Sequence, residues 1–228
     1  MAPFGTIWSY MPSARVSKIQ AVANLNGLEL DIPPNFVLYK DNLTEEYLSK
    51  FPLGKVPGFE GADGARLVES DAIAQYVAES GPLSEQLLGS TPLERASIRS
   101  WISFSDHAFL RPLRELAMWR FGQWEYDEEK ETTQLALLER GLAYMEGQLE
   151  GKTWLGMNEK LSLGDITVAA PLHMAFSLII DKEMRDKYPS IVAWYERVMA
   201  VEEVARAMGE VKFIEKRQVN QGKTDADA

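Results

Sequence analysis

The chain places two short apolar runs close together, Val56-Pro57-Gly58-Phe59 and Arg66-Leu67-Val68-Glu69, with the turn-forming residues Gly61-Ala62-Asp63-Gly64 between them. Apolar runs joined by a glycine-rich turn predict two neighbouring strands. Ser70 to Val77 follows at once, and its apolar residues recur at helical spacing. These residues therefore predict a sheet whose last strand runs directly into a helix.

The residues before this unit alternate strand and helix signals. Thr6-Ile7-Trp8-Ser9-Tyr10 is β-branched and aromatic, which is typical of a short buried strand. A helical pattern then runs from Ser13 to a stop signal at Gly27, Leu28 to Ile32 reads as a second strand, and Thr44 to Leu48 as a short helix with a Thr cap. This order predicts an α/β domain, residues 1–81, in which helices cover the faces of a mixed sheet.

Strand signals disappear after a linker that we expect at residues 82–92, where Gly, Pro and Ser are frequent. Residues 93–217 show only helical spacing, which predicts a second, all-α domain. Pro112 lies inside one of these helices and is expected to kink it. Residues 218–228 are polar and predict a flexible tail.

Composition and charge exclude several classes of function. The 228 residues carry 24 basic and 34 acidic side chains, a net charge of −10, so the phosphates of a nucleic acid would be repelled. No segment approaches about 20 uninterrupted apolar residues, and the N-terminal residues lack the basic start and apolar core of a signal peptide. We therefore expect a cytoplasmic protein that binds neither nucleic acid nor a membrane.

The chain contains no cysteine, and this is the most restrictive single count. It excludes disulfides, thiolate metal ligands, cysteine nucleophiles and dithiol redox chemistry. His107 and His173 are the only histidines and lie far apart in the sequence, so no metal site is expected. Any sulfur chemistry must use a sulfur atom that arrives on a ligand.

Ser162-Leu163-Gly164-Asp165 precedes a nearly continuous apolar run from Ile166 to Ile180. A Ser followed three residues later by an acid is typical of a capping box, in which the two side chains bond main-chain N–H groups at the start of a helix. We therefore expect a structural role for Asp165 and a buried helix after it.

Val56-Pro57 is a candidate for main-chain contact with a ligand. A proline at the start of a strand cannot donate to the sheet ladder. If the Val56–Pro57 bond is cis, Val56 turns its N–H and C=O outward, where an extended peptide can pair with them. A trans proline explains the same two residues, and taken alone it is the commoner arrangement.

Glu69 and Ser70 lie where a strand runs into the N-terminus of a helix. The main-chain N–H groups there are unpaired, and the helix dipole attracts a carboxylate. Ser70 can offer its N–H and hydroxyl to that anion, and Glu69 can accept an ammonium group, so the pair can hold an α-amino acid. The alternative is that Ser70 only caps its own helix.

Together these features resemble the glutathione transferase superfamily over nearly the whole chain, and within it the transferase-like N-terminal part of translation elongation factor 1 gamma. The residues that carry the resemblance are Phe51-Pro52-Leu53-Gly54-Lys55-Val56-Pro57, Phe59-Glu60-Gly61, Glu69-Ser70-Asp71-Ala72-Ile73-Ala74-Gln75-Tyr76-Val77, Trp101-Ile102-Ser103-Phe104 and Gly209-Glu210-Val211-Lys212. The resemblance implies the glutathione transferase fold, in which an N-terminal thioredoxin-like mixed-sheet domain precedes a C-terminal helical-bundle domain. It also implies a homodimer.

The ligand that the resemblance implies is glutathione, γ-Glu-Cys-Gly. In that case Val56, held by Pro57, pairs with the cysteinyl unit, and Glu69 and Ser70 hold the γ-glutamyl end. Further positions match contacts made in related classes. They are Asn42 and Lys55, which correspond to residues that reach the glycine carboxylate, and Asp106, which resembles an acid that crosses the dimer interface to the γ-glutamyl ammonium. A solvated helix residue explains Asp106 equally well.

The sequence signal for the group that activates the glutathione sulfur is less specific. In the superfamily a hydroxyl or thiol after the first strand donates a hydrogen bond to the glutathione sulfur, and a donor there lowers the pKa of the thiol. The candidates are Tyr10 and Ser13, with Arg15 supplying positive potential. Their spacing does not reproduce the pattern of the better-known classes, and Ser13 can equally be the N-cap of the first helix.

Three functions remain open. The first is a transferase in which the glutathione thiolate attacks a small hydrophobic electrophile. The second is an isomerase in which the thiol adds to an activated olefin and leaves after bond rotation, giving trans/cis isomerisation. The third is a non-catalytic glutathione transferase-like module of elongation factor 1 gamma.

Overall fold

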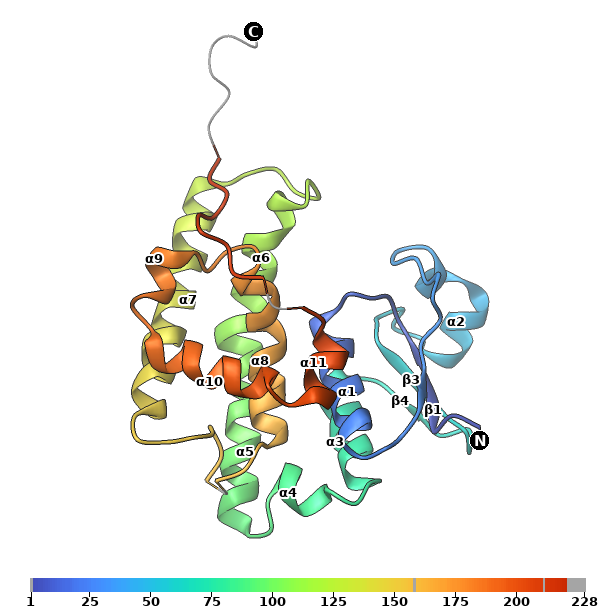
Figure 1. Ribbon diagram of the computed structural model, residues 1–228. Helices are drawn as coiled ribbons and strands as arrows, with labels where there is room; N and C mark the ends of the chain where they lie inside the picture. The colour runs from blue at the N-terminus through green and yellow to red at the C-terminus, as the bar shows by residue number, and fades with distance from the viewer. Residues whose placement is uncertain (1, 158, 211, 221–228) are drawn as a thin grey trace, which may run out of the picture.

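A computed structural model describes residues 2–157, 159–210 and 212–220. It contains an N-terminal sheet domain and a larger C-terminal array of helices, packed side by side (Figure 1). Residue 211 of the Gly209 to Lys212 motif, and most of the predicted tail 218–228, lie outside the described residues.

The N-terminal sheet has four short strands in the order β2-β1-β3-β4. β1 (Gly5–Trp8) pairs in parallel with β2 (Leu30–Asp31) and antiparallel with β3 (Gly58–Gly61), which pairs antiparallel with β4 (Arg66–Leu67). The predicted mixed sheet is therefore confirmed, but the strands are shorter than expected. β3 begins at Gly58, because Pro57 has no N–H to contribute to the ladder.

Helices cover both faces of this sheet (Figure 1). α1 (Ala14–Leu25) and α3 (Ser70–Glu79) lie on the face turned toward the C-terminal helices, and Ile7 of β1 is fully buried there. The short η1 (Asp41–Leu43) and α2 (Glu45–Lys50) lie on the opposite face. The predicted Thr cap of α2 is present, because the Thr44 hydroxyl accepts a hydrogen bond from the N–H of Tyr47.

The described residues after α3 are helical or irregular, as the loss of strand signals predicts. The predicted linker contains a short helix, α4. The helices are α4 (Ser84–Leu88), α5 (Pro92–Ser105), α6 (Arg111–Arg120), α7 (Glu128–Leu149), α8 (Leu163–Phe176), α9 (Lys182–Arg185), α10 (Pro189–Met199) and α11 (Glu202–Met208).

Pro112 distorts the long helical segment that runs through α5 and α6. It lies two residues into α6, directly after a π-helical turn, η2 (Asp106–Leu110). A proline has no N–H for the carbonyl four residues earlier, and a π-helical turn is one way to accommodate the missing bond. The predicted irregularity at Pro112 is present, and it gives Asp106 the first position of that turn.

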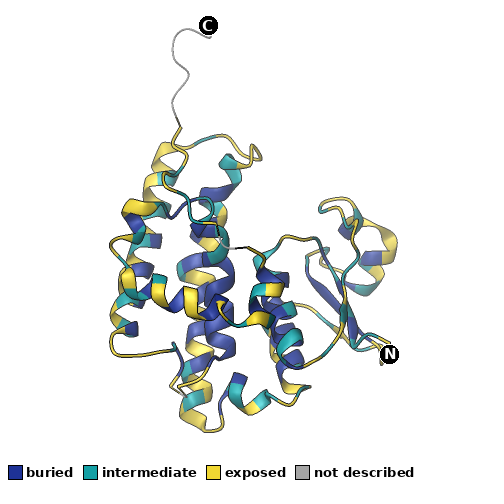
Figure 2. Ribbon diagram, in the orientation of Figure 1, coloured by how far each residue is buried: buried dark blue, intermediate teal, exposed yellow. Residues whose placement is uncertain are grey.

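α8 forms the centre of the C-terminal domain, and its residues Leu163 to Leu172 are all buried (Figure 2). The predicted capping box is confirmed at its start, where the Ser162 hydroxyl and the Asp165 carboxylate bond each other's main-chain N–H groups. The buried Asp165 carboxylate also accepts hydrogen bonds from Leu155 N–H and Trp194 Nε1–H. Asp165 therefore acts as a structural centre, as predicted.

The two domains share one buried core. α1 packs against both α8 and α11, and buried apolar side chains form one cluster across this interface. Among the helices in the described ranges, none is both long and apolar enough to cross a membrane.

Candidate functional site

The pairing of the strands brings the predicted site segments to one end of the sheet. Trp8, the last residue of β1, pairs with Gly58, the first residue of β3, and the neighbouring Phe59 pairs with Leu67, the last residue of β4. The segments after β1, before β3 and after β4 therefore leave the sheet at the same end. They carry Tyr10 to Arg15, Lys55 to Pro57, and Glu69 with Ser70.

Two helices begin at this end of the sheet. The first main-chain bond of α3 runs from Ile73 N–H to Glu69 C=O, so the three N–H groups before Ile73 have no acceptor within the helix. Ser13 occupies the N-cap position of α1. Both N-termini carry the positive end of a helix dipole, and they favour an anion beside them.

Ser70 is the first residue of α3 and not its cap. Glu69 occupies the N-cap position, without a capping bond from its side chain, and Ser70 is 8% exposed. Within the described ranges the Ser70 hydroxyl forms no hydrogen bond. The capping interpretation of Ser70 is therefore wrong, and its hydroxyl remains available to a ligand.

Glu69 is exposed and has a φ of 67°, in the left-handed region. A non-glycine residue there costs backbone free energy, and such residues concentrate at functional sites. The turn at Glu69 joins β4 to α3.

The Val56–Pro57 peptide bond is cis. Val56 is half-buried, and within the described part of the chain neither its N–H nor its C=O forms a hydrogen bond. Both groups are therefore free to pair with an extended main chain, which is the arrangement that the cis alternative predicted.

The segment ahead of Val56 is held by two buried side chains. The Asn42 side chain accepts a hydrogen bond from Tyr39 N–H and donates one to Gly54 C=O, each at 2.6 Å. The Tyr47 hydroxyl donates to Lys55 C=O at 2.6 Å, and burial raises the pKa of Tyr47 to about 12, so the hydroxyl keeps its proton. The Lys55 side chain is exposed.

Four charged side chains, Arg15, Lys18, Asp71 and Asp106, line a small cavity between the two domains. Lys18 of α1, which is buried, forms an ion pair with the partly exposed Asp71 of α3. Arg15 and Asp106 line the same small cavity as this pair. Burial lowers the pKa of Lys18, although Asp71 opposes the shift. The structure thus brings Arg15 and Asp106 together, from opposite domains.

The Lys18–Asp71 pair is the part of the site that sequence analysis missed. Lys18 lies among the buried residues of α1, so a charged residue in an apolar helical pattern was the available signal. Its partner, Asp71, is 53 positions away in the sequence, and spacing alone does not connect them.

The three candidates for sulfur activation lie on or beside the start of α1. Tyr10, Ser13 and Arg15 are all half-buried. Ser13 occupies the cap position without making the capping bond, so its hydroxyl oxygen accepts no hydrogen bond from a main-chain N–H of α1. The N-cap interpretation of Ser13 is right about position, and the hydroxyl is still free to donate elsewhere.

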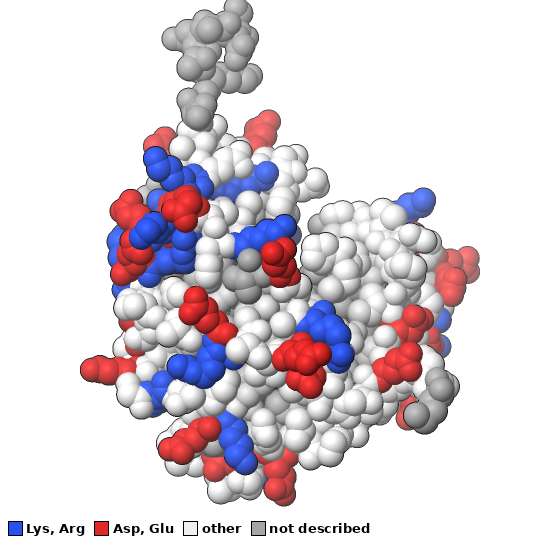
Figure 3. Space-filling model, in the orientation of Figure 1, with Lys and Arg blue, Asp and Glu red and all other residues white. Residues whose placement is uncertain are grey.

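The molecular surface is hollowed between the two domains. The space-filling view shows a notch between the α6 end of the C-terminal domain and the N-terminal domain (Figure 3). In the described residues, no group of three or more His, Asp or Glu side chains is arranged to hold a metal ion.

Comparisons with known proteins agree with this architecture. Residues 3–79 match the family model of the glutathione S-transferase N-terminal domain, and residues 104–202 match that of the C-terminal domain. A glutathione S-transferase-like protein, LUC7, from Fusarium sp is 48% identical over 221 residues, covering 97% of this chain and 100% of that protein. The chain belongs to the glutathione S-transferase family.

The resemblance to elongation factor 1-gamma is also confirmed. The protein from Danio rerio is 32% identical over 215 residues, which are 93% of this chain and 47% of that protein. Among solved structures, the theta class glutathione S-transferase of Xanthomonas axonopodis pv. citri with glutathione bound superposes with a TM-score of 0.79 at 24% identity, covering 92% of this chain and 100% of that one. The glutathione transferase fold is thus confirmed in both domains.

Proposed function

We propose that this chain binds glutathione at the end of its N-terminal sheet where α1 and α3 begin, and that it transfers the bound thiolate to a small hydrophobic electrophile. The observation that carries the proposal is the free main chain of Val56 beside the uncapped start of α3. The first suits an extended peptide, and the second suits a carboxylate. Because the chain has no cysteine, the nucleophilic sulfur must come from that peptide.

Each part of glutathione has a partner in this proposal. The cysteinyl unit pairs with the main chain of Val56, and the γ-glutamyl carboxylate accepts hydrogen bonds from Ser70 and the first N–H groups of α3. Glu69 accepts the γ-glutamyl ammonium, and the exposed Lys55 approaches the glycine carboxylate. The buried Asn42 holds the Lys55 segment in place, because its amide is bonded on both sides to main chain.

The reaction then needs a thiolate. A hydroxyl donor at Ser13 or Tyr10, the N-terminus of α1 and the nearby Arg15 all stabilise negative charge on sulfur and lower the pKa of the thiol. The thiolate forms a carbon–sulfur bond with the electrophile. In a substitution the displaced electron pair leaves with the departing group. In an addition to an enone the electron pair of the C=C bond moves to the conjugated carbonyl, and the resulting enolate takes a proton from water. The electrophile occupies the notch between the domains.

Asp106 and the oligomeric state belong to the same proposal. Asp106 is exposed on the irregular turn η2. We propose that the chain forms a homodimer in the cytoplasm and that Asp106 reaches the γ-glutamyl ammonium across its interface. Sedimentation of the purified chain, and glutathione affinity of Asp106→Asn, test these two parts separately.

A second candidate function is the non-catalytic module, which the match to elongation factor 1-gamma favours. The higher identity to a glutathione S-transferase-like protein, over that protein's whole length, supports the transferase. Calorimetric titration with glutathione, followed by assays on aryl halides and conjugated enones, separates the two. Turnover is expected. Binding of glutathione without turnover would favour the non-catalytic module. The absence of binding would contradict the proposed glutathione site itself.

A further inference from the structure

A second cavity lies on the outer face of the N-terminal sheet, under α2. It has a volume of about 410 Å³, within the size range of small-molecule sites. Its apolar walls are Trp8 at the end of β1, Pro33 and Pro34, Phe36 and Tyr47. None of the ten residues proposed for the glutathione site lines it.

The aromatic walls of this cavity already accommodate a cation. The Lys50 ammonium lies 4.3 Å from the centroid of the Trp8 ring, so the face of that ring is in use as a cation–π surface. Phe36 packs edge-on against Tyr47 with ring centroids 5.9 Å apart. Three aromatic rings around one cavity make a wall of the kind that recognises organic cations.

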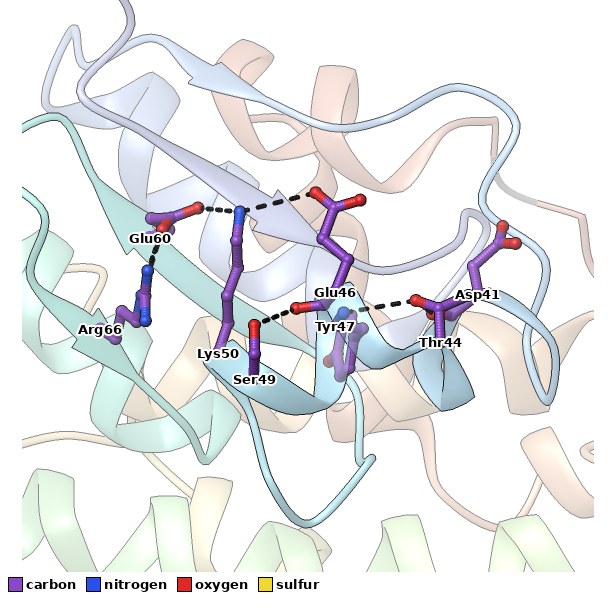
Figure 4. Close-up of polar contacts among 8 residues, drawn as sticks. All are labelled: Asp41, Thr44, Glu46, Tyr47, Ser49, Lys50, Glu60 and Arg66. Atoms are coloured by element: carbon purple, nitrogen blue, oxygen red, sulfur yellow. Dashed lines mark hydrogen bonds and ion pairs between the residues drawn. The ribbon is translucent and has the colours of Figure 1, made fainter.

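The charges around the cavity leave a negative excess. Lys50 is paired with Glu60 at 2.8 Å and lies 4.0 Å from Glu46 (Figure 4). Glu60 is shared with Arg66 of β4, and Asp41 adds a further carboxylate to the lining. Among the residues that line the cavity, the carboxylates of Asp41 and Glu46 therefore outnumber the one basic side chain, Lys50, which is itself paired with Glu60.

We propose that this cavity binds a small organic cation with a flat apolar body. The apolar body fits between Trp8, Phe36 and Tyr47, and the cationic head lies toward Asp41 and Glu46. A neutral ligand would gain only the apolar contacts, and an anion of the same size would be repelled by the two carboxylates. The site is separate from the glutathione groove, and it does not depend on the proposed transferase function.

The test uses benzyltrimethylammonium as the cation and phenylacetate as an anion of similar size. The chain has six tryptophans, and Trp8 is the one that lines this cavity, so indole N–H resonances in ¹⁵N-labelled protein locate binding. The Trp8 resonance is assigned by its loss in Trp8→Phe. We expect benzyltrimethylammonium to shift the Trp8 signal and leave the other indole signals in place.

Two matched variants separate the site from general surface charge. Glu46 and Glu45 are adjacent exposed acids on α2, and only Glu46 lines the cavity. Glu46→Gln is expected to weaken binding of the cation by about threefold to tenfold, the range of a partly exposed charge contact. Glu45→Gln makes the same change in net charge and is expected to leave the affinity within about twofold.

Three outcomes would overturn the proposal. The first is no shift of the Trp8 signal at saturating benzyltrimethylammonium. The second is equal weakening by Glu45→Gln and Glu46→Gln, which would mean non-specific attraction to an acidic surface. The third is phenylacetate binding as tightly as the cation, which would make the cavity an apolar site without charge preference. Since both glutamates are exposed, neither variant is expected to impair folding.

Discussion

Ser70 places a hydroxyl beside the unpaired N–H groups at the start of α3, and this hydroxyl forms no hydrogen bond within the described ranges. A hydrogen bond from its hydroxyl to a carboxylate is charge-assisted. We therefore expect Ser70→Ala to weaken glutathione binding by about 1–3 kcal/mol, measured by calorimetry. Ser49→Ala is the matched control, because Ser49 is an exposed serine on α2 that bonds only its own helix. An unchanged affinity in Ser70→Ala would remove Ser70 from the γ-glutamyl clamp.

The two members of the Lys18–Asp71 pair are expected to differ in what their loss costs. The Lys18 side chain is 5% exposed and the Asp71 side chain 29%. Asp71→Asn leaves a buried ammonium without its ion-pair partner, which costs about 3 kcal/mol of unfolding free energy. Lys18→Met leaves a carboxylate that still reaches water, so the loss should be smaller. Urea unfolding of both variants and of the double variant measures the difference, and equal losses would contradict it.

The capping box of α8 differs from the other helix caps because its acid is buried. Ser162→Ala removes the cap and also one donor to the Asp165 carboxylate. We expect it to lower the unfolding free energy by about 2 kcal/mol, the upper end of the range for cap residues. Thr91 caps α5 at an exposed position, so Thr91→Ala is expected to cost about 1 kcal/mol or less. The order of the two costs, measured by chemical unfolding, is the test.

Ion pairs from Lys50 and Arg66 to Glu60 connect α2 with the strands β3 and β4, and their contribution to stability should be lost in acid. Hydrogen bonds from Lys50 and then Arg66 hold the pKa of Glu60 below its usual value. A carboxyl with a lowered folded pKa contributes stability above its unfolded pKa of about 4.3, and that contribution is lost as pH falls through the folded pKa.

Glu60→Gln should therefore be less stable than the parent chain near neutral pH, by about 1 kcal/mol. The difference should begin to shrink as pH falls below the unfolded pKa of about 4.3, and it should be lost as pH falls further through the lowered pKa of the folded carboxyl. Thermal unfolding of both proteins over this pH range is the measurement. A difference that stays constant with pH would mean that Glu60 acts through packing and not through its charge.

Elements with strong local signals could be predicted, and elements fixed by long-range pairing could not. Thr44 and Ser162 predict the helices that follow them, because a capping side chain bonds a main-chain N–H within three residues. β2 and β4 have two residues each, and their ends depend on which neighbour they pair with. The form of the turn η2 could not be predicted either, since Pro112 predicts an irregular helix at this place but not a π-helical turn.

In the candidate site, too, the residues with a local sequence signal could be predicted, and the contacts between separate elements could not. Val56, Glu69 and Ser70 could be singled out from sequence because the roles proposed for them rest on main chain and on the start of a helix. The Lys18–Asp71 pair and the bond from Tyr47 to Lys55 needed the structure, because each depends on how separate elements pack. The cavity under α2 gave no sequence signal, since prolines and aromatics in a loop are equally typical of ordinary packing.

At the scale of the whole molecule, the two domains are expected to unfold as one unit. Multi-domain chains often unfold in steps, but here α1 is buried against α8 and α11, and one apolar core continues across the interface. Calorimetry should therefore show one transition. Ile102, 3% exposed at the interdomain cavity, provides the perturbation.

Ile102→Ala should lower the unfolding free energy by about 2–5 kcal/mol, the range for a buried isoleucine. If the domains unfold together, hydrogen exchange of the slowest amides in α3 and in α10 should accelerate by the same factor, although Ile102 belongs to α5. Acceleration confined to the C-terminal helices, or two calorimetric transitions, would mean that the sheet domain is stable alone. In that case the notch between the domains could open without unfolding either one.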